Sequence, residues 1–167
     1  MRPLGPLYKV KPLLDEESTR PLLARVVNFQ KVKQSIIETI FREALTLKAL
    51  ECKYLLPIEG IIFNKKSKIM HIFYPQKISL FEYIHLSGTH LSPEDKYTIA
   101  KNIAYALSLL HSCHNPPAHT HLTSKNIMLN PSDHHVYITD YSLRSLKKFA
   151  KVHNKYNNLS AWSSPEM

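Results

Sequence analysis

The stretch that decides the fold is His119-Thr-His-Leu-Thr-Ser-Lys-Asn126, which is followed by two short apolar runs on either side of the turn Asn130-Pro-Ser-Asp133. This order predicts a polar loop, a short strand, a turn, and a second strand that ends on a carboxylate. Such a hairpin would place Asn126 and Asp140 at neighbouring strand ends, where their side-chain oxygens could converge on one cation. The stretch therefore predicts a site for a metal ion and a phosphate group.

Composition limits the class of protein. A chain of 167 residues with 44% hydrophobic content can bury one core or two small lobes. No apolar run reaches the roughly 18 residues of a membrane span, and no signal-peptide pattern opens the chain, so we expect a cytoplasmic protein. Cys52 and Cys113 lie far apart in the sequence, which favours a reducing compartment. The net charge of +9 comes from scattered basic residues, a pattern that disfavours nucleic acid as the partner.

The stretch that begins at His119 resembles the catalytic core of eukaryotic protein kinases, in which His-Arg-Asp-Leu-Lys-x-x-Asn precedes a hairpin and then Asp-Phe-Gly. The resemblance places His119 and Asn126 on the His and the Asn of the first motif. It places Asp140 on the metal-binding Asp of the second motif. Asn126 and Asp140 are therefore the expected metal ligands, with ATP and Mg²⁺ or Mn²⁺ as the cofactors that the resemblance implies.

Departures from the kinase pattern fall on the groups that carry the chemistry. His121 occupies the place of the catalytic Asp, and the other differences are Thr120 for Arg, Thr123 for Lys and Tyr141-Ser142 for Phe-Gly. A neutral imidazole can accept a proton near pH 7, but it lacks the charge of a carboxylate. Loss of a general base typically costs about 10² to 10⁴ in rate. We therefore predict a pseudokinase, and the alternative is a divergent active Ser/Thr or Tyr kinase in which His121 is the base.

The N-terminal part is similar to a kinase small lobe. Two runs with strand propensity, residues 4–10 and 21–27, predict a hairpin. The resemblance places Gly5 at the last glycine of the phosphate-covering loop, Val10 in the second strand and Arg25 at the nucleotide-holding Lys. Two of the three loop glycines are missing, and a planar guanidinium does not replace an ammonium against two phosphates. An ordinary hairpin with one turn glycine is the alternative.

A helix and two strands follow in this part. Apolar residues recur at spacings of three and four from Lys33 to Glu51, which predicts an amphipathic helix of about five turns. The resemblance to the kinase regulatory helix makes Glu43 the partner of Arg25, and a solvated helix charge is the alternative. Strands are predicted at 61–63 and 69–74.

The resemblance assigns the next segments to the hinge and the large lobe. Gln76 is expected to contact the adenine ring, and Met128 is added to the nucleotide contacts. A short helix is expected at 80–84, and Ser92-Pro-Glu-Asp95 predicts the start of a helix that runs to about His111.

The remainder after Asp140 shows no clear periodicity, so a polar and basic loop is predicted up to Ser164-Pro165-Glu166, which is similar to the Ala-Pro-Glu of kinases. A zinc site is an alternative interpretation of the segment 111–121. It holds five residues of the types that bind zinc, which are His111, Cys113, His114, His119 and His121. Their spacing, however, matches no zinc-finger pattern.

The predicted fold is α+β, a two-lobed protein-kinase-like architecture with residues 1–76 as the small lobe and 77–167 as a partial large lobe. The small lobe would hold an antiparallel sheet and one long helix. Because the resemblance reaches only the close of the activation segment, either the chain is a fragment of a kinase domain or something else covers the large-lobe surface that would be exposed. The predicted function is that of a scaffold or allosteric interaction module, whose partners are other proteins of a signalling system, with residual binding of ATP.

Overall fold

The computed structural model describes residues 7–10, 20–30, 32–50, 52–112, 119, 122–141 and 143–153. These residues form two compact units. The first unit holds the described residues of 7–50, 57–76 and 143–153, and the second holds those of 52–56 and 77–141. The chain therefore leaves the first unit after Gln76, visits the second once before that point, and returns to the first at Leu143.

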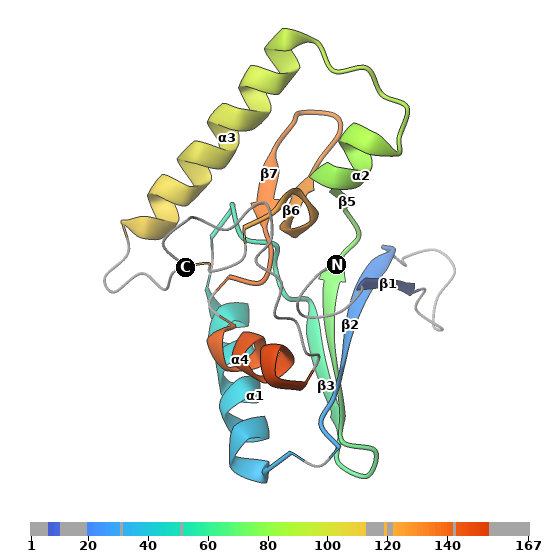
Figure 1. The fold of residues 1–167 in the computed structure, drawn as a ribbon, viewed down its shortest axis with the longest axis vertical. Helices are drawn as coiled ribbons and strands as arrows, with labels where there is room; N and C mark the ends of the chain where they lie inside the picture. Colours follow the sequence, from blue (N-terminus) through green and yellow to red (C-terminus); the bar gives the residue numbers. More distant parts are fainter. Residues whose placement is uncertain are drawn as a thin grey trace. The chain divides into compact units, whose positions relative to one another are not determined.

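The first unit is built on a four-stranded antiparallel sheet with the order β1-β2-β4-β3 (Figure 1). The strands are β1 (Leu7–Val10), β2 (Leu22–Asn28), β3 (Gly60–Asn64) and β4 (Ile69–Pro75). Side chains of β4 alternate, with Met70, Ile72 and Tyr74 buried and their neighbours half-buried. Strict alternation places the core on one face of the sheet.

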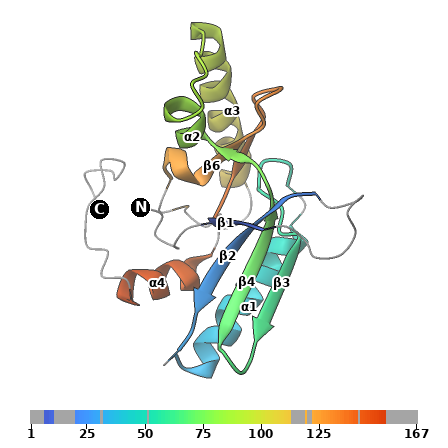
Figure 2. The same cartoon turned by 90° about the vertical axis from the view of Figure 1, so that its right-hand side faces the viewer.

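One long helix covers this core face. Helix α1 (Gln34–Ala49) buries four side chains at spacings of three and four, which are Ile37, Ile40, Ala44 and Leu47. That spacing forms a single stripe on a helix. Figures 1 and 2 show α1 and α4 on the same side of the sheet. The predicted antiparallel sheet with one long helix is thus confirmed.

Helix α4 (Arg144–His153) corrects the sequence-based expectation, which was an irregular basic loop. Leu143 and Leu146 are buried, and the ring of Phe149 lies 5.3 Å from that of Phe29 in the first unit. These three residues recur at a spacing of three, so they share one face of the helix. Lysines between them hide that pattern, because they lower the average hydrophobicity of a segment that is nonetheless amphipathic.

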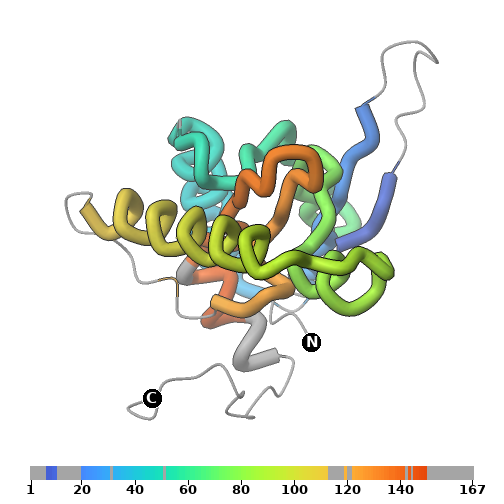
Figure 3. Tube along the Cα trace, turned by 90° about the horizontal axis from the view of Figure 1, so that it is seen from above, coloured from blue at the N-terminus to red at the C-terminus, as the bar shows by residue number. Residues whose placement is uncertain are grey.

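The second unit combines helices with a small antiparallel sheet of order β5-β6-β7. Its elements are β5 (Ile78–Ser79), α2 (Leu80–His85), α3 (Pro93–His111), a 3₁₀ turn (Ser124–Asn126), β6 (Ile127–Leu129) and β7 (Val136–Ile138). Helix α3 runs beside the β6–β7 hairpin (Figure 3). Ile138 also binds the segment 52–56, because its N–H donates to the carbonyl of Tyr54 (2.7 Å) and its carbonyl accepts from Leu56 (3.1 Å). Among the described residues, no helix is long and apolar enough to cross a bilayer.

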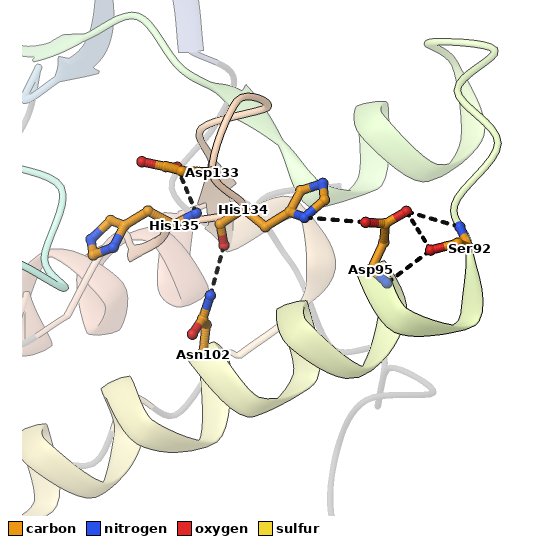
Figure 4. A network of polar contacts seen from close by, with 6 residues as sticks. All are labelled: Ser92, Asp95, Asn102, Asp133, His134 and His135. Atoms are coloured by element: carbon orange, nitrogen blue, oxygen red, sulfur yellow. Dashed lines mark hydrogen bonds and ion pairs between the residues drawn. The ribbon is translucent and has the colours of Figure 1, made fainter.

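A capping box fixes the start of α3 and links it to the hairpin turn (Figure 4). Asp95 accepts hydrogen bonds from the hydroxyl (2.7 Å) and the backbone N–H (3.0 Å) of Ser92, and the N–H of Asp95 donates back to that hydroxyl (3.1 Å). In the turn, His134 places Nδ1 3.5 Å from the Asp95 carboxylate, and its carbonyl accepts from Asn102 (3.0 Å). The hydrogen bonds from Ser92, followed by the charge of His134, hold the pKa of Asp95 below its usual value.

We predict that Asp95→Asn lowers the free energy of unfolding at neutral pH and makes it change less as the pH falls below about 5. The pKa of Asp95 in the folded state lies below the unfolded value of about 3.9. The ionised carboxylate therefore contributes its full stabilisation above about pH 3.9, and this stabilisation is lost as the pH falls through the folded-state pKa. The gap between parent and variant should therefore narrow between about pH 5 and pH 2 in urea denaturation curves. Glu94→Gln, an exposed acid in the same turn, is the control and should keep the parental pH profile. Parallel curves for Asp95→Asn and the parent would contradict the prediction.

Candidate nucleotide and metal site

The hairpin that the sequence predicts is present. Its register places Asn126 opposite Thr139, the residue before Asp140. Ile127 pairs with Ile138 in the ladder of β6 and β7. One residue further out, Thr139 donates from its N–H (3.0 Å) and its hydroxyl (3.1 Å) to the carbonyl of Asn126. Asn126 and Asp140 are 0% and 2% exposed. The two predicted metal ligands therefore stand at the same end of one hairpin in a buried setting.

Asp140 adopts an unusual backbone conformation. Its φ is 60°, in the left-handed region that side chains with a Cβ rarely occupy. Asp and Asn tolerate this region better than most residues, because their short polar side chains can hydrogen-bond locally. Strained backbone of this kind persists only where the surroundings determine it, and it clusters at functional sites. The backbone of Asp140 thus has a conformation of the kind that is found at functional sites.

His119 forms a hydrogen bond to the same end of β7. It is 5% exposed, and its Nε2 lies 2.7 Å from the carbonyl of Thr139. A carbonyl can only accept, so Nε2 carries the hydrogen and donates it. This contact gives His119 a structural role in the second unit.

Tyr141 stands at the position where the kinase motif has Phe, and its hydroxyl makes a hydrogen bond that Phe cannot make. Its side chain is buried, and the hydroxyl donates to the carbonyl of Leu110 at 3.1 Å. Leu110 lies in the last turn of α3, where carbonyl groups have no partner within the helix. The substitution therefore anchors the segment after Asp140 to the end of α3.

Glu43 contacts the start of α4. Its two carboxylate oxygens accept from the backbone N–H of Ser145 at 3.2 and 3.0 Å, and Oε1 also accepts from the Ser145 hydroxyl at 2.8 Å. Ser145 is the second residue of α4, so its N–H is one of the groups that a helix leaves without an internal partner. A negative charge is also favourable at this end of a helix. Glu43 therefore caps α4 from a position 102 residues earlier in the chain.

The structure shows the surroundings of four further residues that the sequence assigns to the nucleotide. Arg25 is fully buried in β2, opposite Ile72 of β4, and its pairing with Glu43 stays a prediction. Val10 is half-buried at the end of β1. The N–H of Gln76 donates to the carbonyl of Pro21 at 2.9 Å, so it would have to give up this bond to bind adenine. Met128 is buried in β6. Gly5 and His121 lie outside the described residues.

The donor set at the hairpin end fits an ion that arrives with a nucleotide. One carboxylate and one amide oxygen are too few for a dedicated protein cage, but Mg²⁺ usually binds through one or two carboxylates together with substrate phosphates. Within the described ranges, no group of three or more His, Cys, Asp or Glu side chains could hold a metal ion. Of the residues weighed for zinc, only His111 and His119 belong to those ranges.

We predict that the contact of Glu43 with Ser145 stabilises α4 as a coupled pair. In a double-mutant cycle of Glu43→Ala and Ser145→Ala, the coupling free energy of unfolding should be about 0.5–3 kcal/mol, because Ser145→Ala removes the hydroxyl that donates to Glu43, while the backbone N–H at position 145 can still donate. Amide hydrogen exchange should rise in α4 for either single variant. Glu38→Ala, on an exposed position of α1, is the matched control and should leave exchange in α4 unchanged. Additive effects of the two substitutions would contradict the contact between the Ser145 hydroxyl and Glu43, and unchanged exchange in α4 for Glu43→Ala would contradict the contact with the backbone N–H.

Comparison with known proteins yields a match over almost the whole chain. The model of the family described as protein tyrosine and serine/threonine kinase matches residues 9–167. The chain is 28% identical over 117 residues to the leucine-rich repeat receptor-like protein kinase PEPR1 of Arabidopsis thaliana, which covers 65% of this chain and 10% of PEPR1. It is 32% identical over 89 residues to an inactive receptor-like serine/threonine-protein kinase of Arabidopsis thaliana, which covers 53% of this chain and 18% of that protein. The chain thus spans between a tenth and a fifth of the length of these relatives.

The solved kinase domain of maize SIRK1 (sucrose-induced receptor kinase 1), bound to AMP-PNP, has a similar fold. The TM-score is 0.75 and the sequence identity is 22%, and the match covers 99% of this chain and 57% of the SIRK1 chain. This confirms the predicted α+β kinase-like fold, with an antiparallel small-lobe sheet and a partial large lobe.

Proposed function

Because the chain belongs to the protein tyrosine and serine/threonine kinase family, we propose that it is a pseudokinase that works as a scaffold or allosteric interaction module. The observation that carries the proposal is His121, an imidazole at the position of the catalytic carboxylate. Kinases use that carboxylate to orient the substrate hydroxyl and to accept its proton. A neutral imidazole offers one acceptor and no negative charge, so it cannot replace both functions.

A second loss supports the same proposal. Thr123 stands where the motif has a Lys, so that position supplies no positive charge to the transferred phosphoryl group. Preorganised charge is often the largest single contribution to catalysis, and removal of one such donor typically costs about 10² to 10³ in rate. Added to the loss of the general base, about 10² to 10⁴, these changes leave little turnover.

The role of Glu43 adds support from the first unit. In the resemblance, this carboxylate pairs with the basic residue of β2, here Arg25, which would hold the nucleotide phosphates. Its oxygens accept three hydrogen bonds from Ser145, so Glu43 also has a structural role. Movement of Glu43 toward the nucleotide would take the acceptor from the N–H of Ser145, and we propose that this cost disfavours the nucleotide-holding arrangement.

We propose that nucleotide binding survives in part through Asn126 and Asp140. When bound, Mg²⁺ or Mn²⁺ would neutralise phosphate charge. The amide oxygen of Asn126 and the carboxylate of Asp140 would hold the ion at the hairpin end, in a buried setting where their oxygens interact strongly with charge. Arg25, Val10 and Gly5 are the proposed contacts of the nucleotide in the first unit, with Gln76 beside the adenine.

A divergent active kinase is the second candidate, and two observations favour it. Both proposed metal ligands are retained, and the relative PEPR1 is described as a protein kinase. In that case His121 would accept the proton of a protein hydroxyl, and Ser, Thr or Tyr side chains would be the substrates.

We predict that ATP with Mg²⁺ or Mn²⁺ raises the melting temperature of the full chain. A ligand that binds only the folded state stabilises it by mass action, by about 2.7 kcal/mol at a hundredfold excess over Kd. Asp140→Ala should abolish the part of the shift that depends on metal. Asp133→Ala, an exposed acid in the hairpin turn, is the control and should keep the shift. Absence of a shift for the parent would leave a scaffold without nucleotide.

Two variants, His121→Asp and Asp140→Ala, separate the pseudokinase from the active kinase. For a pseudokinase, restoration of the carboxylate alone should give no measurable phosphate transfer to a generic protein substrate, because the charge at position 123 and the loop glycines are still missing. Turnover by the parent chain that disappears in Asp140→Ala would establish the active kinase instead.

A further inference from the structure

The face of the four-stranded sheet opposite α1, called here the outer face, carries a continuous set of apolar and aromatic side chains. The strand registers place Val26, His71 and Ile62 in one row across β2, β4 and β3. The next row brings Tyr8 and Phe73 onto the same face, on either side of Ala24. The rings of His71 and Phe73 stack with centroids 6.2 Å apart.

Part of the outer face is exposed to solvent, although Ala24 is buried and His71 and Phe73 are half-buried. Tyr8, Val26 and Ile62 are 52%, 38% and 58% exposed. Both described helices of the first unit lie on the other side of the sheet, and Figure 2 shows β2, β4 and β3 in front of α1. The solvent face of an antiparallel sheet is usually polar, so three exposed aliphatic and aromatic side chains in neighbouring rows are unusual. No strand position on this face holds a carboxylate.

A lysine cluster stands at one end of the outer face. The turn between β3 and β4 exposes Lys65, Lys66 and Lys68. The side chain of Asn64 fixes the turn, because its oxygen accepts from the N–H groups of Lys66 (3.0 Å) and Ser67 (3.1 Å). Among the described residues, no carboxylate pairs with these lysines. Their charges therefore remain available to an anionic partner.

We propose that the outer face, together with this lysine turn, binds an anionic lipid surface. Exposed apolar side chains in neighbouring rows of one sheet face can enter a lipid surface together. Val26 and Ile62 would enter the boundary between headgroups and acyl chains, while the three lysines would contact acidic headgroups. Stable peripheral binding needs two such signals, apolar burial and a basic cluster, and both are present here. None of the strand residues on this face is an acid, so the strands add no repulsion against an anionic surface.

The test is co-sedimentation of the full chain with vesicles of phosphatidylcholine, alone or mixed with phosphatidylserine. Binding should need phosphatidylserine and should weaken as salt rises, since surface charges are screened. Each lysine near an anionic surface contributes roughly fivefold in affinity, so the triple variant Lys65→Gln, Lys66→Gln, Lys68→Gln should lose on the order of a hundredfold.

A second triple variant, Lys33→Gln, Lys96→Gln, Lys101→Gln, removes the same charge from exposed positions elsewhere and should lose less than about tenfold. For the apolar side chains, Ile62→Thr should weaken binding while Ile36→Thr, exposed on α1, should not. Thermal melts check that each variant is folded.

Three outcomes overturn the proposal. They are no binding to phosphatidylserine vesicles, equal losses for the two lysine triples, and self-association in ultracentrifugation that Ile62→Thr abolishes while vesicle binding persists. The last would assign the face to a second copy of this chain. Nucleotide is absent from all of these measurements, so their result does not depend on the proposed pseudokinase function.

Discussion

Thr139 is the residue on which the second unit's candidate site depends. Its N–H and hydroxyl donate to the carbonyl of Asn126, and its own carbonyl accepts from Nε2 of His119. These three hydrogen bonds join the loop before β6, the start of β6 and the end of β7. The next residue, Asp140, has a φ of 60°. A strained backbone persists where the surroundings determine it, and the hydrogen bonds of Thr139 supply part of those surroundings.

In the first unit, one carboxylate binds the start of α4. Glu43 has two oxygens, and both accept from Ser145. An ionised carboxylate has about four lone-pair sites, so the contacts with Ser145 leave little capacity for a further partner. This contact joins α1 to α4 inside the first unit, and it gives Glu43 a role in the fold that does not require a nucleotide.

Much of this fold follows from local sequence patterns, and the rest depends on partners that are distant in sequence. The stripe of Ile37, Ile40 and Ala44 predicts α1, and the capping box of Ser92 and Asp95 predicts the start of α3. By contrast, an acceptor for the N–H groups at the start of α4 is supplied by Glu43 from 102 residues away. The placement of 52–56 likewise depends on hydrogen bonds to Ile138 that no local pattern encodes.

The motif residues fall into two groups, those that the fold itself needs and those that only the reaction would need. The hairpin made Asn126 and Asp140 neighbours in prediction and in structure, but their roles with metal stay predictions. The imidazole of His119 and the main chain of Asn126 make hydrogen bonds that hold the hairpin end, so folding alone can account for them. A motif residue with a structural role is weak evidence for a reaction. The positions that separate shape from chemistry are those whose side chains the reaction itself would need, above all the carboxylate of Asp140 and the side chain at position 121.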